Sequence, residues 1–141
     1  MSQSAKAAPR PRVDQSGRVL GPKAIQTRER LLHATDELLS KRSLRELRVV
    51  DIARKAGTSP ATFYQYFPDA ESAVLVLAAE LTEAWHEELA TLVADGDWTG
   101  DPDRAARHAS EGFLEFWTSH RAVLGVLDLA SAEGDERFRD P

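Results

Sequence analysis

Residues 49–68 constrain the fold most, because they carry the pattern of two short helices joined by a tight turn. The first part places four apolar residues on one helical face: Val49, Ile52, Ala53 and Ala56. Gly57 follows where a helix-ending residue in the left-handed conformation is expected. Ser59 and Pro60 then stand in the order of an N-cap and a first helical residue. The pattern predicts a helix-turn-helix over about 47–67, whose second helix can enter a DNA major groove.

Helical periodicity also covers most of the remaining chain. Apolar residues recur at spacings of three and four over about 22–40 and 69–94, and again over about 103–119 and 121–133. The Gly-, Asp- and Pro-rich segment 95–102 is typical of a loop. The chain carries no strand pattern, so the sequence predicts an all-α protein.

Charge divides the chain into a basic front and an acidic back. Residues 1–68 hold 13 Lys and Arg against 6 Asp and Glu, whereas residues 69–141 hold 5 against 17. The net charge of −5 alone argues against nucleic acid, but this distribution favours a phosphate-binding module attached to a second part. The alternative is a set of charges that serves solubility only.

The boundaries follow from these patterns. Residues 1–21 lack hydrophobic periodicity and are expected to form a flexible basic arm, which follows DNA phosphates, enters a minor groove or is only a solvated tail. Residues 22–68 are expected to be the DNA-binding head. Residues 69–141 are expected to be a helical ligand-binding and dimerisation domain, apparently truncated.

The chain lacks the residues that several classes of functional site require. The chain has no cysteine, and His86 beside Glu83 is a single pair without a second ligand set, so neither a metal site nor a cofactor is expected. No phosphate loop, dinucleotide fingerprint or nucleophile elbow is present, and we expect no enzyme. The longest apolar run, residues 73–79, is far too short for a membrane span, and the N-terminal residues lack the apolar core that is typical of a signal peptide. A cytoplasmic protein is therefore expected.

The run 27–79 resembles the N-terminal domain of the TetR family of bacterial transcriptional regulators. The matching pieces are TRERLL at 27–32, VxDIA at 49–53, AGTS at 56–59 and TFYxYF at 62–67, with Pro68 behind them. The resemblance implies a three-helix DNA-binding head, a linking fourth helix and a helical regulatory body. It also implies a homodimer on a palindromic operator, with most relatives acting as repressors released by a small ligand.

Two positions depart from the family pattern, and the chain ends early. Arg48 stands where the family usually has a small hydroxyl residue, and Ala70 stands where it commonly has a phosphate-contacting Lys. The missing Lys is expected to remove about one phosphate contact. Residues 95–141 supply fewer helices than the family's regulatory bodies contain, so this is either a fragment or a shortened member.

The second helix of the motif supplies most candidate DNA contacts. Phe63 and Phe67 share one face and are expected to anchor it inward. Gln65 is the best base reader, because its amide can both donate to and accept from adenine. The full candidate set is Arg48, Thr58, Ser59, Thr62, Tyr64, Gln65 and Tyr66. Thr62 has no evident packing task, Tyr66 is expected to face outward, and Tyr64 is expected near the edge, with a core position as its alternative.

Four aromatic residues of the acidic half are candidates to line a pocket for a small hydrophobic effector: Trp85, Phe113, Phe116 and Trp117. The alternative is ordinary bundle core. The sequence thus predicts a DNA-binding regulator, most simply a ligand-released repressor. Its rivals are an all-α protein-interaction module without DNA binding, and an enzyme in the helical body.

Overall fold

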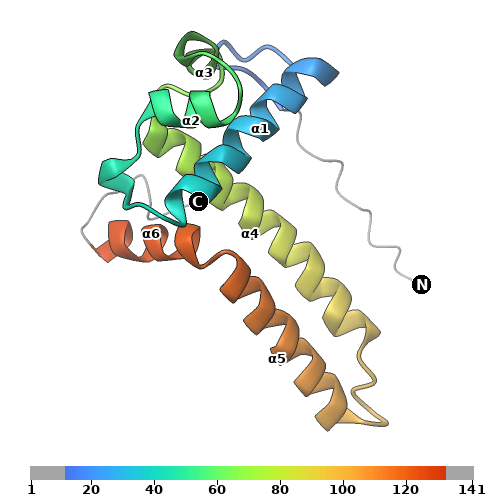
Figure 1. Cartoon of the computed structure of the whole chain (residues 1–141). Coiled ribbons are helices and arrows are strands. Elements are labelled where there is room, and N and C mark those ends of the chain that lie inside the picture. Colours follow the sequence, from blue (N-terminus) through green and yellow to red (C-terminus); the bar gives the residue numbers. More distant parts are fainter. Residues whose placement is uncertain (1–11, 133–141) are drawn as a thin grey trace.

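A computed structural model describes residues 12–132 of the 141-residue chain (Figure 1). The prediction of an all-α protein is confirmed, since the described part contains six α-helices and one short 3₁₀ helix. These are α1 (Pro22–Leu39), η1 (Leu44–Glu46), α2 (Val49–Lys55), α3 (Pro60–Tyr66), α4 (Ala70–Asp95), α5 (Pro102–Ser119) and α6 (Arg121–Ala132). Each expected helix is present, with boundaries shifted by two residues at most.

Local capping residues explain where the helices begin. Asp69 is the N-cap of α4, and its side chain accepts a hydrogen bond from the Ser72 N–H (2.7 Å). Asp101 does the same for α5 through the Arg104 N–H (3.0 Å). Proline occupies the start of α1, α3 and α5, where the missing N–H costs no helical hydrogen bond.

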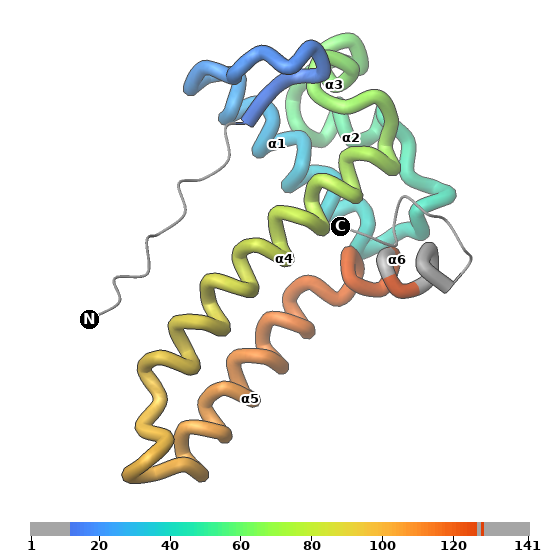
Figure 2. Tube along the Cα trace, turned by 180° about the vertical axis from the view of Figure 1, so that it is seen from behind, coloured from blue at the N-terminus to red at the C-terminus, as the bar shows by residue number. Residues whose placement is uncertain are grey.

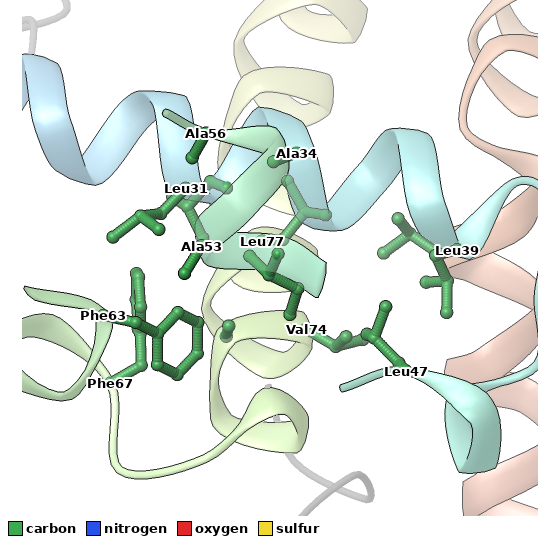
Figure 3. Close-up of a cluster of buried hydrophobic side chains, with 14 of the residues drawn as sticks. Leu31, Ala34, Leu39, Leu47, Ala53, Ala56, Phe63, Phe67, Val74 and Leu77 are labelled. Carbon is green, nitrogen blue, oxygen red and sulfur yellow. The ribbon is translucent and has the colours of Figure 1, made fainter. Parts of the chain in front are cut away.

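The hydrophobic core lies where α1, α2 and α3 meet the first turns of α4 (Figure 3). Leu31, Ile52 and Phe63 are fully buried there, and Phe67 and Val74 pack beside them. Because Ala73, Val74, Leu77 and Ala78 of α4 belong to this cluster, the core extends past residue 68, where we placed the end of the head.

Beyond the core, α4 runs away from the head and α5 returns beside it (Figure 1). Helix α6 contacts α1, α4 and α5, and its Val123 is fully buried in the head's core cluster. The acidic half of the chain is therefore packed against the basic half at two places, the start of α4 and the start of α6.

The N-terminal segment differs from the expected flexible arm. Residues 1–11 lie outside the described residues. Residues 12–20 form a hydrogen-bonded turn in which Val13 and Val19 make an antiparallel bridge. The physical reason is the Asp14, Ser16 and Gly17 combination, whose side-chain hydrogen bonds and left-handed glycine favour a turn without any hydrophobic periodicity.

Candidate nucleic-acid interface

The turn between α2 and α3 has the geometry that the sequence predicted. Gly57 lies in the left-handed region, with φ of 68°. The Thr58 N–H donates to the Ala53 carbonyl (2.9 Å), and the Gly57 N–H donates to the Arg54 carbonyl (3.1 Å). This pair of bonds is a Schellman motif, which closes the end of α2 and fixes the direction of the chain. The half-buried Thr58 is therefore engaged through its backbone.

Ser59 caps α3, as expected. Its hydroxyl oxygen accepts a hydrogen bond from the Thr62 N–H (3.1 Å) and lies 3.0 Å from the Thr62 hydroxyl. Thr62 is half-buried and has this local contact with Ser59, which the sequence did not indicate, while its expected contact with DNA stays a prediction. The reason is the three-residue spacing between cap and first turn, which brings the two hydroxyl groups together.

Two buried aromatic side chains determine which face of α3 is open to solvent. Phe63 and Phe67 are buried with ring centroids 5.4 Å apart, as the sequence predicted. Gln65 lies on the opposite side of the helix and is exposed. Tyr64 is 52% exposed, so its core alternative is excluded in this structure. An amide and a phenol thus stand on the open face of a rigidly held helix.

Tyr66 does not stand on that open face, which corrects our expectation. It is half-buried and packs against the core, with its ring centroid 6.4 Å from that of Phe67. Tyr64 and Tyr66 lie at similar angles, roughly 80°, on either side of the inward aromatic pair. The helical period alone therefore could not distinguish them. The tertiary neighbours decide, because Tyr66 borders a groove shared with Val13 and Val76.

Arg48 is exposed at the N-cap of α2, where its own backbone carbonyl accepts bonds from Asp51 and Ile52. The Asp51 carboxylate pairs with Arg42 (2.9 Å) and contacts Arg54 (3.7 Å). Lys55 binds Glu37 at 3.0 Å, and this hydrogen bond lowers the pKa of the Glu37 carboxyl. Part of the basic charge of the head is thus engaged within the fold, whereas Arg48 faces solvent.

One polar contact beneath the interface was missed from the sequence. Arg28 is only 8% exposed, and its guanidinium donates to Glu80 of α4 at 2.6 Å. The same guanidinium lies 5.7 Å from the centre of the Phe67 ring, directly after α3. A signal was present, because Arg28 lies three and four residues before Leu31 and Leu32 and so shares their inward face.

The four aromatic residues of the expected effector pocket do come together. Trp85 of α4 stacks on Phe116 of α5 with centroids 4.6 Å apart, and its centroid lies 5.6 Å from that of Phe113. Trp117 in turn stacks on Phe113 (6.4 Å). Phe113 and Trp117 remain 48% and 46% exposed. The aromatic rings of the cluster pack against one another, and part of their surface is open to solvent. An effector site at this cluster stays a prediction.

Residues 12–132 lack the features of two further kinds of site. No three His, Cys, Asp or Glu side chains gather there as metal ligands would. None of the helices in this range has both the length and the apolar character needed to cross a membrane.

Known protein families match both halves of the chain. Residues 31–72 match the model of the bacterial regulatory proteins of the tetR family, and residues 89–140 match that of the tetracyclin repressor-like C-terminal domain. The first match contains α2, the turn and α3, and the second contains α5 and α6. The two family models therefore match successive segments of one chain.

The individual proteins to which this chain is similar are named as regulators. The HTH-type transcriptional regulator EthR of Mycobacterium tuberculosis is 33% identical over 106 residues, covering 75% of this chain and 49% of the relative. The uncharacterized HTH-type transcriptional regulator YvdT of Bacillus subtilis is 34% identical over 112 residues, covering 79% and 47%. The fatty acid degradation regulator FadR of Bacillus halodurans superposes with a TM-score of 0.44 at 19% identity, over 84% of this chain and 70% of that one. The chain spans about half the length of the curated relatives EthR and YvdT.

Proposed function

The chain belongs to the TetR family of bacterial regulatory proteins, and from this premise we propose that it is a sequence-specific, DNA-binding transcriptional regulator. The observation that carries the proposal is the open face of α3. Gln65 and Tyr64 are exposed there, while Phe63 and Phe67 hold the opposite side of the helix in the core. A short helix held in this way can enter a major groove without first having to become ordered.

Each group of the interface has a distinct task in this proposal. The Gln65 amide reads a base edge, with adenine the best match to its donor and acceptor. The exposed Tyr64 hydroxyl and the Arg48 guanidinium bind backbone phosphates, which sets the register of the helix on the duplex. Ser59, Thr62 and Thr58 hold the turn and present α3, and the Ser59 and Thr62 hydroxyls also border the DNA. Tyr66 supports the helix from the core side.

The finer proposal is a homodimeric repressor that a small hydrophobic effector releases from a palindromic operator in the cytoplasm. Two recognition helices must lie about 34–36 Å apart to read half-sites one helical turn apart. Helix α4 joins the head to the aromatic cluster around Trp85, so a ligand bound there can bias the separation of the heads. A ligand that favours the wrong separation lowers the affinity for DNA.

Fluorescence anisotropy tests the proposal with two labelled duplexes, one enriched from a random pool by the protein itself and one scrambled from it. We expect tight binding to the enriched duplex, and binding to both duplexes should weaken as salt increases. Equal, weak binding to both duplexes at both salt concentrations would favour the rival, an all-α protein-interaction module. Turnover of a small molecule without DNA binding would favour an enzyme.

A further inference from the structure

Residues 12–20 form a turn that lies beside α3 (Figure 2). The Gln15 N–H donates to the Gln65 carbonyl oxygen at 3.4 Å. The last carbonyls of a helix have no partner within the helix, so this bond satisfies one of them at the end of α3. The turn is therefore attached to the same residue whose side chain faces outward as the best base reader.

The conformation of the turn is fixed by its own residues. The Asp14 carboxylate accepts hydrogen bonds from the Ser16 hydroxyl (2.6 Å), the Ser16 N–H (2.8 Å) and the Arg18 N–H (3.0 Å). These bonds, the Ser16 hydroxyl first, lower the pKa of the Asp14 carboxyl. Gly17 occupies the left-handed region with φ of 80°. The segment is thus ordered without contributing to the hydrophobic core.

The two cations of the turn have different surroundings. Arg12 pairs with Glu29 of α1, which fastens the base of the turn to the head. Arg18 lies in the loop between the two bridged valines and is exposed. Arg18 thus lies exposed in the same turn that the Gln15 N–H attaches to the Gln65 carbonyl at the end of α3.

We propose that residues 12–20 are a second DNA-contacting element, in which Arg18 binds a backbone phosphate beside the groove that α3 enters. The inference rests on the proposed function and adds a contact outside the helix-turn-helix. Phosphate contacts fix the position of a protein on the duplex without reading its sequence. A turn that is already ordered loses less conformational freedom on binding than a flexible arm would.

The substitution Arg18→Gln tests the contact in the full chain, with the enriched and the scrambled duplex as probes. Affinity should fall about fivefold on both duplexes, because a phosphate contact does not depend on sequence. The slope of log affinity against log salt should become shallower by about one per protomer. Arg107→Gln removes the same charge from the exposed surface of α5 and should leave both the affinity and the slope close to wild type.

A second pair of variants tests whether the ordered turn, and not charge alone, is needed. Gly17→Val keeps the net charge but places a β-branched residue at positive φ, where the backbone is strained although no neighbour lies within 4 Å. It should lose the same affinity as Arg18→Gln, and the double variant should lose no more than either single one. Gly17→Asn should bind like wild type, because asparagine tolerates this conformation.

The outcomes separate the two proposals. If the wild-type protein binds the enriched duplex but Arg18→Gln matches Arg107→Gln, the turn does not contact DNA and only this inference fails. Wild-type binding by Gly17→Val also overturns the inference, since the ordered turn would then be unnecessary. If the wild-type protein binds no DNA, the proposed function and this inference fail together.

Discussion

At the scale of single residues, the interface depends on how its inward side is held. Arg28 contacts both Glu80 of α4 and the ring of Phe67, so it links α1, α4 and the end of α3. A charge buried to this extent is tolerated only when it is paired. Arg28 is therefore a positioning residue for α3, although it lies away from the open face.

The substitution Arg28→Met tests this role. Losing the guanidinium leaves the Glu80 carboxylate without its partner, and Glu80 is 33% exposed, so solvent compensates in part. We expect the free energy of unfolding in urea to fall by about 1–3 kcal/mol. Arg30→Met is the matched control on the exposed side of the same helix, and its effect should be within about 0.5 kcal/mol of zero. Equal effects of both substitutions would contradict the role assigned to Arg28.

Sequence reasoning predicted the residues whose position follows from local rules. Gly57, Ser59, Phe63 and Phe67 all lie as expected, because capping and helical period act within a few residues. Tyr66 was placed wrongly because its burial depends on the neighbouring turn and on α4, which are distant in sequence or lack a periodic pattern. The ordered segment 12–20 was missed for the same reason, although Asp14, Ser16 and Gly17 carried a recognisable turn signal.

At the scale of secondary-structure elements, α3 is too short to be stable alone. It has seven residues, so its stability comes from its cap, its aromatic anchors and the turn before it. The Ser59 hydroxyl satisfies the Thr62 N–H, one of the donors that a helix start leaves unpaired. The cap therefore contributes both to the stability of the head and to the order of the interface.

Removing the cap should have a measurable cost. Ser59→Ala is expected to lower the free energy of unfolding by about 1 kcal/mol, and Ser59→Asp should restore most of it, because aspartate also accepts from the first-turn N–H. Thermal and urea unfolding measure the stability of both variants. Ser110→Ala in α5, where the hydroxyl only bonds back to the Ala106 carbonyl, is the control. An unchanged free energy of unfolding for Ser59→Ala would show that the cap is dispensable. A loss that Ser59→Asp does not restore would show that the capping hydrogen bond is not its cause.

Helix α1 carries two adjacent carboxylates with opposite pKa shifts. Burial raises the pKa of Asp36, with the nearby His120 and His33 acting against this shift, whereas the Lys55 hydrogen bond lowers that of Glu37. A raised pKa means that the folded state binds the proton more readily than the unfolded state, so ionised Asp36 opposes folding above its pKa. For Glu37 the sign is reversed, and its contribution is lost as the pH falls.

The pair predicts substitutions of opposite sign. Asp36→Asn should raise the free energy of unfolding at neutral pH, and this gain should shrink as the pH falls through the raised pKa of Asp36 in the folded state and vanish below its ordinary pKa. Glu37→Gln should lower stability at neutral pH, and the loss should also shrink in acid. Urea denaturation across the pH range measures both. A gain for Asp36→Asn that persists unchanged in acid would show that burial of the charge is not its cause.

At the scale of the whole molecule, the two halves of opposite charge share one core. Val123 of α6 and the first turns of α4 lie in the same cluster as α1, α2 and α3, so a change in the acidic half can reach the head through packed contacts. The sequence predicted the charge division and the helices on either side. It could not predict that α6 returns to the head, because that contact joins residues far apart in the chain.

The number of copies that bind DNA together should be visible in the symmetry of the DNA sequence they select. If two copies bind through closed two-fold symmetry, the duplexes enriched from a random pool should contain inverted repeats. The half-site centres should lie about one helical turn apart, and sedimentation should give two chains per duplex. Enriched sequences without such symmetry, or one chain per duplex, would contradict the homodimeric arrangement.

The central claim is that the open face of α3 reads bases. The most direct test measures how tightly Gln65→Ala binds the enriched and the scrambled duplex, and takes the ratio of the two affinities. We predict that affinity for the enriched duplex falls by about 1–3 kcal/mol while affinity for the scrambled duplex changes little, so that the ratio collapses toward one. Thr91→Ala, an exposed position on α4, should keep the wild-type ratio. An unchanged ratio for Gln65→Ala, or equal losses on both duplexes, would contradict the claim.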